Sequence, residues 1–340
     1  MASSTLQIVV KSRPTGAMVP GETFTSGTVP SPTEQDLEDG QLLVETLYLS
    51  LDPIMRRWLN AGNGIVKTTV GEPMPGFVLG RVLASRSPDL AAGDLVTAFS
   101  VWARAAVLPA GSFEKVDYLP ASLPLTDVLG VLGLTGLTAY FGMLGIGKPK
   151  PGETVVVSSA AGATGSVAAQ LAKIRGARVV AIAGGEQKGK WLRGLGVDEV
   201  LDYKDDAFEE KFAKAVGGGI DLYFDSVGGR MLELALANIN KFARIILNGD
   251  ISGYNTTTPH GIKSIFPIAP KSATIHGLNI FDHLKDAAPA RAELGQWLQD
   301  GTLQRTQTVV EGGLEAAPQG LADLFTGKNT GKMLVEVRGD

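Results

Sequence analysis

The chain has 340 residues, of which 44% are hydrophobic and 19% charged, and its formal net charge is −4. Single domains usually stop growing below about 250 to 300 residues, so a chain of this length is expected to form two domains. The composition is that of an ordinary folded protein, and its slightly acidic balance does not suit a nucleic-acid backbone. We therefore expect a small-molecule partner and no nucleic acid.

Cysteine is absent, and the only histidines are His260, His276 and His283. Without cysteine the chain can form neither a disulfide nor a Cys-ligated metal site. The histidines show no zinc-binding spacing, so no metal site is predicted. The N-terminus lacks a basic segment followed by an apolar core, which argues against a secretory signal and makes the cytoplasm the expected compartment.

The first part of the chain has the pattern of antiparallel β structure. Between about Leu6 and Val116, short apolar runs such as LLVETLYLSL and FVLGRVLAS are separated by clusters of glycine and proline. This spacing is typical of a barrel-like β domain. We assign residues 1–125 to this domain.

An uncharged run of twenty residues follows, from Val128 to Gly147. Its length meets the criterion for a membrane-spanning helix. Six glycines dilute its apolar character, and it directly precedes a strand-like run. We therefore interpret it as a helix buried between the domains and predict no membrane association.

After residue 125, strand-like runs alternate with helical stretches. Helices are expected at about 167–175, 188–195, 208–216 and 231–239. The apolar runs are TVVVSS, ARVVAIAG, EVLDY, IDLYFDSVG, ARIILNG and ATIHGLNI. Six short strands with helical connections predict a doubly wound parallel sheet. Residues 126–284 are assigned to this second domain, and residues 285–340, with a helix and a final strand, are expected to complete the first domain.

The turn after the first of these six runs carries the pattern A-x-G-x-x-G, beginning at Ala160. This is a degenerate dinucleotide-binding fingerprint, but it follows a strand and begins a helix, as the fingerprint requires. Gly162 would let backbone N–H groups approach a pyrophosphate, and Gly165 would let helix and strand pack closely. A turn without a ligand is the alternative. The predicted cofactor contacts of the turn are Ala161, Gly162, Ala163, Thr164 and Gly165.

The end of the second strand, AGGEQKGKWLR, bears on which nicotinamide cofactor would bind. Lys188, Lys190 and Arg193 could neutralise a 2′-phosphate. Glu186 could instead bind the ribose diol of NAD. Three cations against one acid favour NADP, although each cation could also belong to a solvated helix face.

Six runs of the sequence resemble, in order and spacing, the zinc-independent medium-chain reductases, a family that includes prostaglandin reductase and plant alkenal double-bond reductases. The runs are LYLSLDPIMR at 47–56, GLTGLTAYFGML at 133–144, AAGATGS at 160–166, YFDSVGG at 223–229, GDISGYN at 249–255 and GKNTGKMLV at 327–335. The resemblance implies an α/β fold with a GroES-like β-barrel domain and a Rossmann domain. It also implies a homodimer that uses NADPH to reduce the carbon–carbon double bond of α,β-unsaturated aldehydes and ketones.

The same resemblance implies roles for individual residues. Lys188 and Tyr203 resemble ligands of the 2′-phosphate, and Asn329 resembles an asparagine near the cofactor phosphates. Tyr254 resembles the tyrosine beside the nicotinamide ribose and the substrate, and we expect it to be catalytic, with simple packing over the cofactor as the alternative. Further expected cofactor contacts are Ser252 and Phe281, and the expected substrate pocket comprises Tyr48, Ile54 and Tyr254. Ile54 and Ser226 depart from the tyrosine and asparagine that are usual in the family.

The absence of cysteine also bears on mechanism, because zinc alcohol dehydrogenases of related fold need thiolate ligands. Reduction of a conjugated alkene needs hydride delivery to the β-carbon and stabilisation of the enolate, without such a Lewis acid. The leading hypothesis is therefore an NADPH-dependent ene-reductase. The alternatives are NADP-dependent chemistry on a secondary alcohol or ketone, and a non-catalytic NADPH-binding sensor or interaction protein. Ser158, Ser159 and Asp225 have no evident histidine partner, so a hydrolytic triad is not supported.

Overall fold

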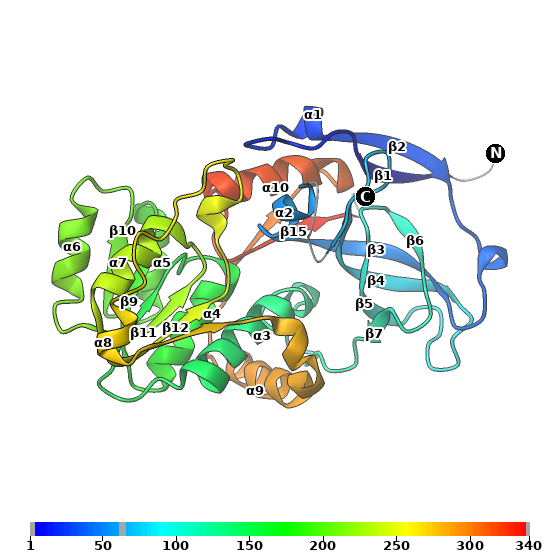
Figure 1. Cartoon of the computed structure of the whole chain (residues 1–340). Helices are drawn as coiled ribbons and strands as arrows, with labels where there is room; N and C mark the ends of the chain where they lie inside the picture. The colour runs from blue at the N-terminus through cyan, green and yellow to red at the C-terminus, as the bar shows by residue number, and fades with distance from the viewer. Residues whose placement is uncertain (1–3, 61–65, 338–340) are drawn as a thin grey trace. The chain divides into compact units, whose positions relative to one another are not determined.

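The structure, a computed structural model, describes residues 4–60 and 66–337. It divides the chain into two compact units (Figure 1). The first unit takes the residues up to 129, together with 307–329 and those from 333 onward. The second unit takes residues 130–306 and 330–332. Each unit has its own sheet and its own core, as the predicted α/β architecture requires.

The first unit is built on a seven-stranded sheet in the order β14-β15-β3-β4-β5-β7, with β6 paired to β3. Its strands are β3 (Leu42–Leu51), β4 (Pro75–Ser85), β5 (Leu95–Val101), β6 (Ala105–Leu108), β7 (Phe113–Lys115), β14 (Gln307–Val310) and β15 (Lys332–Glu336). A separate antiparallel pair is formed by β1 (Ser4–Val10) and β2 (Phe24–Pro30). The pairings of β3 with β4, β6 and β15 are antiparallel, which confirms the predicted strand pattern.

The helices of the first unit are short, except for α10. They are α1 (Pro20–Thr23), η1 (Glu34–Asp36), α2 (Met55–Trp58), η2 (Leu125–Val128), η6 (Leu314–Ala316) and α10 (Ala317–Thr326). Leu321 of α10 is fully buried in the same core as Leu49 of β3 and Val78 of β4. Gly320 lets this helix approach the sheet, because a Cβ there would lie 2.7 Å from Cδ1 of Leu51. The apolar face of α10 therefore packs on the sheet.

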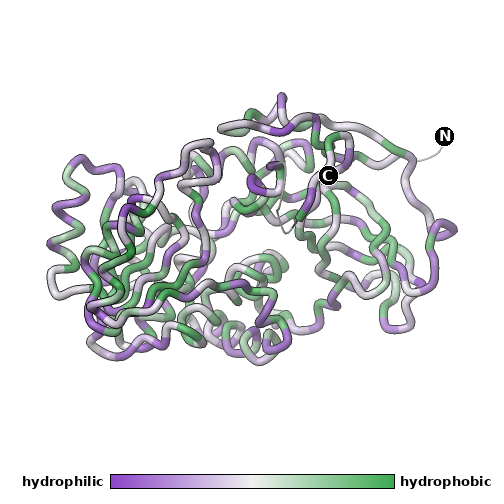
Figure 2. The backbone as a smooth tube through the Cα atoms, in the orientation of Figure 1, coloured by the Kyte–Doolittle hydropathy of each residue, from purple (hydrophilic) through white to green (hydrophobic). Residues whose placement is uncertain are grey.

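The second unit contains a parallel sheet of six strands in the order β10-β9-β8-β11-β12-β13. The strands are β8 (Thr154–Val157), β9 (Arg178–Ala183), β10 (Glu199–Asp202), β11 (Ile220–Asp225), β12 (Ile239–Leu247) and β13 (Thr274–Gly277). The central strands are hydrophobic along much of their length (Figure 2) because helices cover both of their faces. The strand order reverses between β8 and β11, and in such sheets ligands bind outside the carboxyl ends of the strands at this reversal.

The helices of the second unit follow the predicted alternation with the strands. They are α3 (Leu134–Tyr140), the π-helix η3 (Phe141–Gly147), α4 (Ala163–Ile174), α5 (Glu186–Gly194), α6 (Phe208–Ala215), α7 (Gly229–Ala237), η4 (Ile251–Gly253), α8 (Ile268–Lys271), η5 (Ile280–Asp286) and α9 (Ala287–Gln299). Helix α4 begins at Ala163, earlier than the predicted start at residue 167, because the residues after Gly162 are already helical.

The uncharged run at 128–147 is not one helix but α3 followed by η3, both in the second unit. Its glycines let η3 approach the sheet closely. A Cβ on Gly142 would lie 2.6 Å from the Phe224 ring, and one on Gly147 would lie 2.9 Å from Leu222. Within residues 4–60 and 66–337, no helix has both the length and the apolar composition that a bilayer crossing requires.

Residues 285–306 were predicted to belong to the first domain, but the structure places them in the second unit. Arg291 of α9 donates a hydrogen bond from Nε to the Leu132 carbonyl at 3.0 Å. The Tyr140 hydroxyl donates to Glu293 Oε2 at 2.5 Å, and burial together with this carboxylate raises the pKa of Tyr140 to about 12. These contacts fix α9 against α3. The final strand β15 returns to β3, where Met333 pairs with Leu51, as expected.

Candidate functional site

The glycine turn connects the carboxyl end of β8 to the start of α4. Ser159 has a φ of 50°, in the left-handed region that residues with side chains seldom adopt. Gly162 is the N-cap of α4 and has no side chain that could bond the first N–H groups of this helix. The turn therefore presents backbone donors and the positive end of a helix dipole, which is an arrangement that favours anions.

Gly165 lets the start of α4 pack closely against the turn that follows β8. A Cβ at this position would lie 2.4 Å from the Ser159 carbonyl oxygen and 2.9 Å from Cα of Ala160. These are backbone atoms, so no side-chain rotation could relieve the contact. The Ala161 carbonyl accepts a hydrogen bond of 2.8 Å from the Gly331 amide, which ties the turn to residues 330–332 of the same unit. The predicted turn residues Ala163 and Thr164 are half-buried at the start of the helix.

A second group of predicted residues lies at the carboxyl ends of β9 and β10. The side chains of Tyr203 and Lys204 cover Gly184, since a Cβ there would lie 2.8 Å from the tyrosine ring and 3.0 Å from Cε of Lys204. Lys188, in the first turn of α5, is half-buried. Burial, and then the nearby charge of Lys204, lower the pKa of the Lys188 ammonium group. The two ammonium groups repel one another here, and a bound anion would relieve that repulsion.

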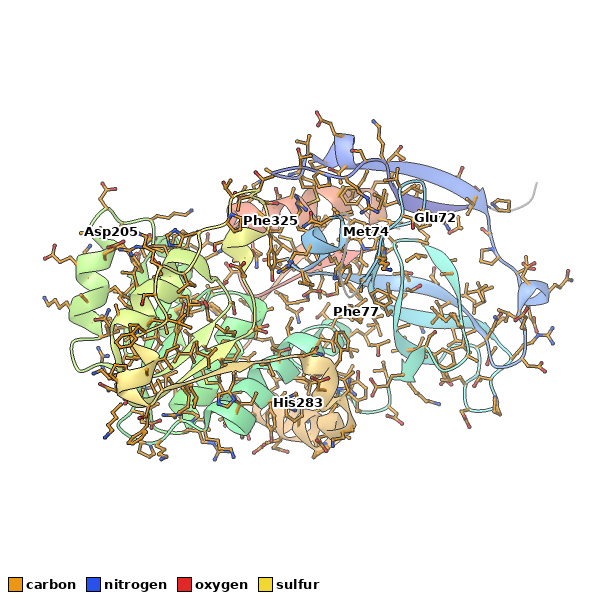
Figure 3. All side chains as sticks on the ribbon, viewed as in Figure 1. Glu72, Met74, Phe77, Asp205, His283 and Phe325 are labelled. Atoms are coloured by element: carbon orange, nitrogen blue, oxygen red, sulfur yellow. The ribbon has the colours of Figure 1, made fainter. Side chains whose placement is uncertain are left out.

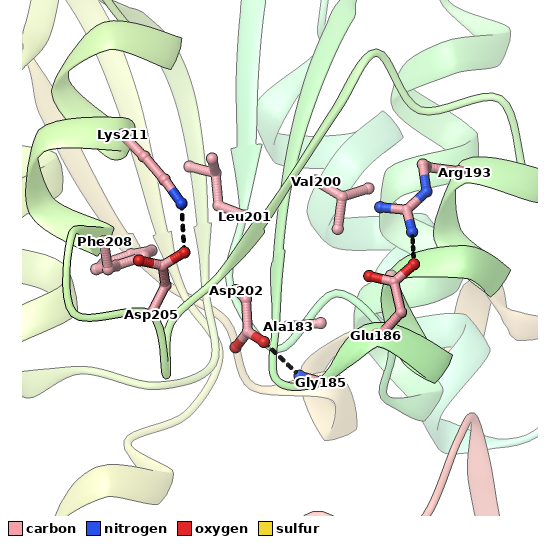
Figure 4. A pocket seen from close by; sticks show the side chains of 11 residues that line it. Ala183, Gly185, Glu186, Arg193, Val200, Leu201, Asp202, Asp205, Phe208 and Lys211 are labelled. Carbon is pink, nitrogen blue, oxygen red and sulfur yellow. Dashed lines mark hydrogen bonds and ion pairs between the residues drawn. The ribbon is translucent and has the colours of Figure 1, made fainter.

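The acid that could have favoured NAD is already paired. Glu186 forms an ion pair with Arg193 on the same helix (Figure 4). Asp202 shapes the adjoining turn, because its Oδ2 accepts from the Gly185 amide at 2.9 Å and its Oδ1 from the Lys204 amide at 2.9 Å. Of the three cations that the sequence pointed to, only Lys188 is half-buried at this strand tip. Ala183, Gly185, Glu186, Arg193, Asp202 and Phe208 are among the residues that line a pocket of about 160 Å³ beside it.

Tyr254 lies on the loop that follows β12. Its side chain is buried, with 8% exposed, and its hydroxyl oxygen accepts a hydrogen bond from the Asp250 amide at 3.3 Å. That oxygen is 3.5 Å from the position that a Cβ on Gly249 would take, so the ring points back towards the carboxyl end of β12. Ser252 is exposed on the same loop, and its amide donates to the Val227 carbonyl at 3.1 Å.

The remaining predicted residues lie elsewhere. Phe281 is 48% exposed in η5 of the second unit. Tyr48, Ile54 and Asn329 belong to the first unit, where Asn329 is buried and Ile54 is exposed at the start of α2. The Tyr48 hydroxyl donates to Glu336 at 3.4 Å, and burial together with this carboxylate raises the pKa of Tyr48.

Ile54 lies one helical turn before Trp58, whose ring centroid is 5.8 Å from that of Phe99 and 6.5 Å from that of Phe77. Phe77 projects from β4 of the first unit (Figure 3). The first unit thus holds a cluster of aromatic rings around Trp58, one helical turn from the exposed Ile54. The second unit, by contrast, gathers the glycine turn, the Lys188 group and the Tyr254 loop at the carboxyl edge of its own sheet.

Comparisons with known proteins identify the relatives of this chain. Residues 6–116 match the family described as the N-terminal domain of oxidoreductase, and residues 163–294 match the family described as zinc-binding dehydrogenase. The NADPH-dependent curcumin reductase of Escherichia coli (strain K12) is 37% identical over 98% of this chain and 96% of that protein. Prostaglandin reductase 1 of Bos taurus is 38% identical over 88% of this chain and 90% of that protein.

Among solved structures, CurA from Vibrio vulnificus in complex with NADPH is 36% identical. Its TM-score is 0.90, with 98% of this chain and 100% of that chain covered. The chain belongs to the zinc-independent medium-chain reductases. The predictions of this family, of its two-domain α/β fold and of an oxidoreductase are therefore confirmed.

One matched family is described as zinc-binding, but the residues of this reductase do not fit a zinc centre. The sequence has no cysteine, and residues 4–60 and 66–337 contain no group of three or more histidine, aspartate and glutamate side chains that could hold a metal. The chemistry considered below is therefore assigned to side chains and a nicotinamide cofactor.

Proposed function

We propose that this reductase uses NADPH to reduce the carbon–carbon double bond of α,β-unsaturated aldehydes and ketones. The observation that carries the proposal is the arrangement in the second unit. The neighbouring ammonium groups of Lys188 and Lys204 lie at the strand tips of the sheet edge that also carries the glycine turn and the buried Tyr254 hydroxyl. Enzymes of this kind need an anchor for a phosphorylated cofactor and a hydrogen-bond donor for the reacting carbonyl.

NADP as the cofactor is confirmed by the family, since relatives of this chain are NADP-dependent and the similar CurA structure contains NADPH. The residues described above fit this cofactor. The uncapped start of α4 offers N–H donors to a pyrophosphate. Lys188, Lys204 and the Tyr203 hydroxyl would hold a 2′-phosphate, and the nearby acid Glu186 forms an exposed ion pair with Arg193. Ser252, Phe281 and Asn329 complete the proposed cofactor contacts.

Bound NADPH supplies a hydride, which is the chemistry that side chains alone cannot provide. When the β-carbon of the substrate is reduced, negative charge develops on its carbonyl oxygen. We assign to the Tyr254 hydroxyl the hydrogen bond that stabilises this oxygen. A proton added to the α-carbon, from Tyr254 or from water, completes the saturated product.

Tyr48 and Ile54 are proposed to contact the substrate. Ile54 has no hydroxyl, unlike the tyrosine that is usual in the family, and it stands beside the Trp58 aromatic cluster. An isoleucine side chain offers no hydrogen-bond partner, so contact with it favours apolar substituents over polar ones. Bulky or aromatic enones are therefore the substrates we expect to be turned over fastest.

The function is tested by mixing the purified protein with NADPH and a panel of aliphatic and aromatic enones. We expect the nicotinamide absorbance to fall, with a saturated carbonyl compound as the product. A secondary alcohol with NADP⁺ is the comparison reaction. Turnover of the alcohol alone would support the alcohol–ketone alternative, and tight NADPH binding without oxidation by any substrate would support a sensor.

The homodimer is proposed on the exposed edge of the second sheet. All four residues of β13 are exposed, and Ile265 and Phe266, which precede this strand in the sequence, are 63% and 72% exposed. An unpaired edge strand can pair with the same strand of a second copy. The cytoplasmic location remains a prediction from the sequence.

Ile275→Lys is expected to convert the dimer to a monomer in light scattering. Val309→Lys, on the edge strand β14 of the other sheet, is the matched control, since both side chains are 38% exposed. The control should leave the dimer intact. A monomeric wild-type protein would contradict the proposal.

A further inference from the structure

Asp225 ends β11, beside the point where the strand order of the second sheet reverses. Its side chain is fully buried. Oδ1 accepts hydrogen bonds from the Tyr223 hydroxyl at 2.9 Å and from the Ser158 hydroxyl at 3.1 Å. The same oxygen accepts from the amides of Val227 and Gly228, both at 3.0 Å. One carboxylate oxygen therefore holds the 225–228 turn and joins it to the end of β8.

The other carboxylate oxygen of Asp225, Oδ2, is buried and has no hydrogen-bond partner among the described residues. Burial raises the pKa of Asp225 even though four donors to Oδ1 oppose that effect. A buried, half-satisfied carboxylate lowers the stability of a fold. Its presence is therefore better explained by what it holds in place than by a gain in stability.

The turn that Asp225 holds is bonded to the loop that carries Tyr254. The Ile251 amide donates to the Ser226 carbonyl at 3.2 Å, and the Ser252 amide donates to the Val227 carbonyl at 3.1 Å. Asn248 Nδ2 donates to the Ser226 hydroxyl at 3.1 Å. The two middle residues of the turn, Ser226 and Val227, are thus bonded to the loop.

The 225–228 turn and the Tyr254 loop also pack against each other through the Asp250 side chain. A Cβ on Gly228 would lie 2.2 Å from Asp250 Oδ1, and one on Gly253 would lie 2.5 Å from Oδ2. The Asp250 side chain therefore fills the space between the turn and the loop. The amide of the same residue donates to the Tyr254 hydroxyl. A displacement of the 225–228 turn would consequently also move the Tyr254 hydroxyl.

We propose that Asp225 is a positioning residue, which sets the place of the Tyr254 hydroxyl relative to the cofactor turn by fixing the 225–228 turn to the end of β8. Ser158 is the link to that strand, because its hydroxyl donates to Asp225 and accepts from the Ser226 amide at 2.9 Å. The inference rests on the proposed function, since it assigns Tyr254 a role in the reaction.

The test is a double-mutant cycle of Asp225→Asn and Tyr254→Phe with NADPH and an enone. The neutral amide keeps the shape of Asp225 but weakens its charge-assisted hydrogen bonds. We expect Asp225→Asn to lower kcat about fivefold with little change in the dissociation constant of NADPH. In the Tyr254→Phe background the same change should lower kcat by less than about twofold, because the hydroxyl being positioned is gone.

Asp221→Asn is the matched control. Asp221 lies at the amino end of the same strand, far from the turn. Its carboxylate accepts hydrogen bonds from the Thr154 amide at 2.8 Å and from the Asn240 side chain at 2.9 Å. Its replacement should alter thermal stability without altering kcat. Equal losses from Asp225→Asn in both Tyr254 backgrounds, or a similar loss from Asp221→Asn, would overturn the proposal.

Hydrogen exchange separates this inference from the proposed function. Asp225→Asn should speed the exchange of the Ile251 and Ser252 amides, whether or not any enone is reduced, while the β9 and β10 amides keep their protection. Should Asp225→Asn prove too unstable, Ser158→Ala is measured in its place, with the same expectation. Unchanged exchange in the loop, or faster exchange throughout the sheet, would contradict a positioning role even in an inactive protein.

Discussion

Replacing Lys188 by alanine is expected to raise the KM for NADPH about thirtyfold and to leave the KM for NADH within about a factor of two. The side chain is half-buried, and burial and the charge of Lys204 already lower the pKa of its ammonium group. A 2′-phosphate bound there would form a charge-assisted contact with Lys188 that NADH, lacking that phosphate, cannot form. Steady-state kinetics with both cofactors measures the difference.

Lys190→Ala is the control for this prediction, because Lys190 is exposed on the same helix. Its replacement removes the same charge from α5 and should change neither constant by more than about twofold. Equal losses with NADPH and NADH in Lys188→Ala would show that the lysine does not recognise the phosphate. A loss of NADPH affinity in Lys190→Ala as large as that in Lys188→Ala would point to a general effect of helix charge.

Replacing Gly165 by alanine is expected to weaken NADPH binding more than about thirtyfold and to lower the melting temperature by roughly 3 to 10 °C. The added methyl group would lie 2.4 Å from the Ser159 carbonyl oxygen, so the start of α4 must move relative to the turn. That movement would also displace the N–H donors of the turn from the pyrophosphate. Cofactor fluorescence and thermal unfolding measure the two effects.

Gly194→Ala is the matched control, since a Cβ at the end of α5 meets no atom within 4 Å. Alanine is favoured over glycine in a helix, so this variant should keep or slightly raise the melting temperature and bind NADPH normally. An unchanged affinity in Gly165→Ala would show that the turn does not hold the cofactor.

The features that the sequence predicted well are those encoded in a short stretch. The alternation of apolar runs with helical stretches predicted the parallel sheet, and the glycines at 162 and 165 predicted a close strand–turn–helix connection. Such patterns are local because backbone conformation and burial set them within a few residues. The predicted order of strands and helices is therefore correct, although a helix such as α4 begins a few residues from its predicted start.

The features that sequence reasoning missed depend on contacts between distant residues. Helix α9 belongs to the second unit through Arg291 and Glu293, whose partners are more than a hundred residues earlier in the chain. Lys204 directly follows Tyr203 in the sequence, but no local pattern indicates that its ammonium group lies near that of Lys188. Glu186 and Arg193 are seven residues apart, so helical periodicity places them on the same face of α5, although two turns apart.

The return of β15 to β3 bears on how the protein is made by the ribosome. Leu334 and Val335 are fully buried in the first unit, although they are translated after every residue of 130–306. The second unit can thus fold on the nascent chain while the Tyr48–Leu51 edge of β3 still awaits its partner. An unpaired apolar edge can pair with another chain, so the unit whose translation begins first is also the one whose sheet is completed last.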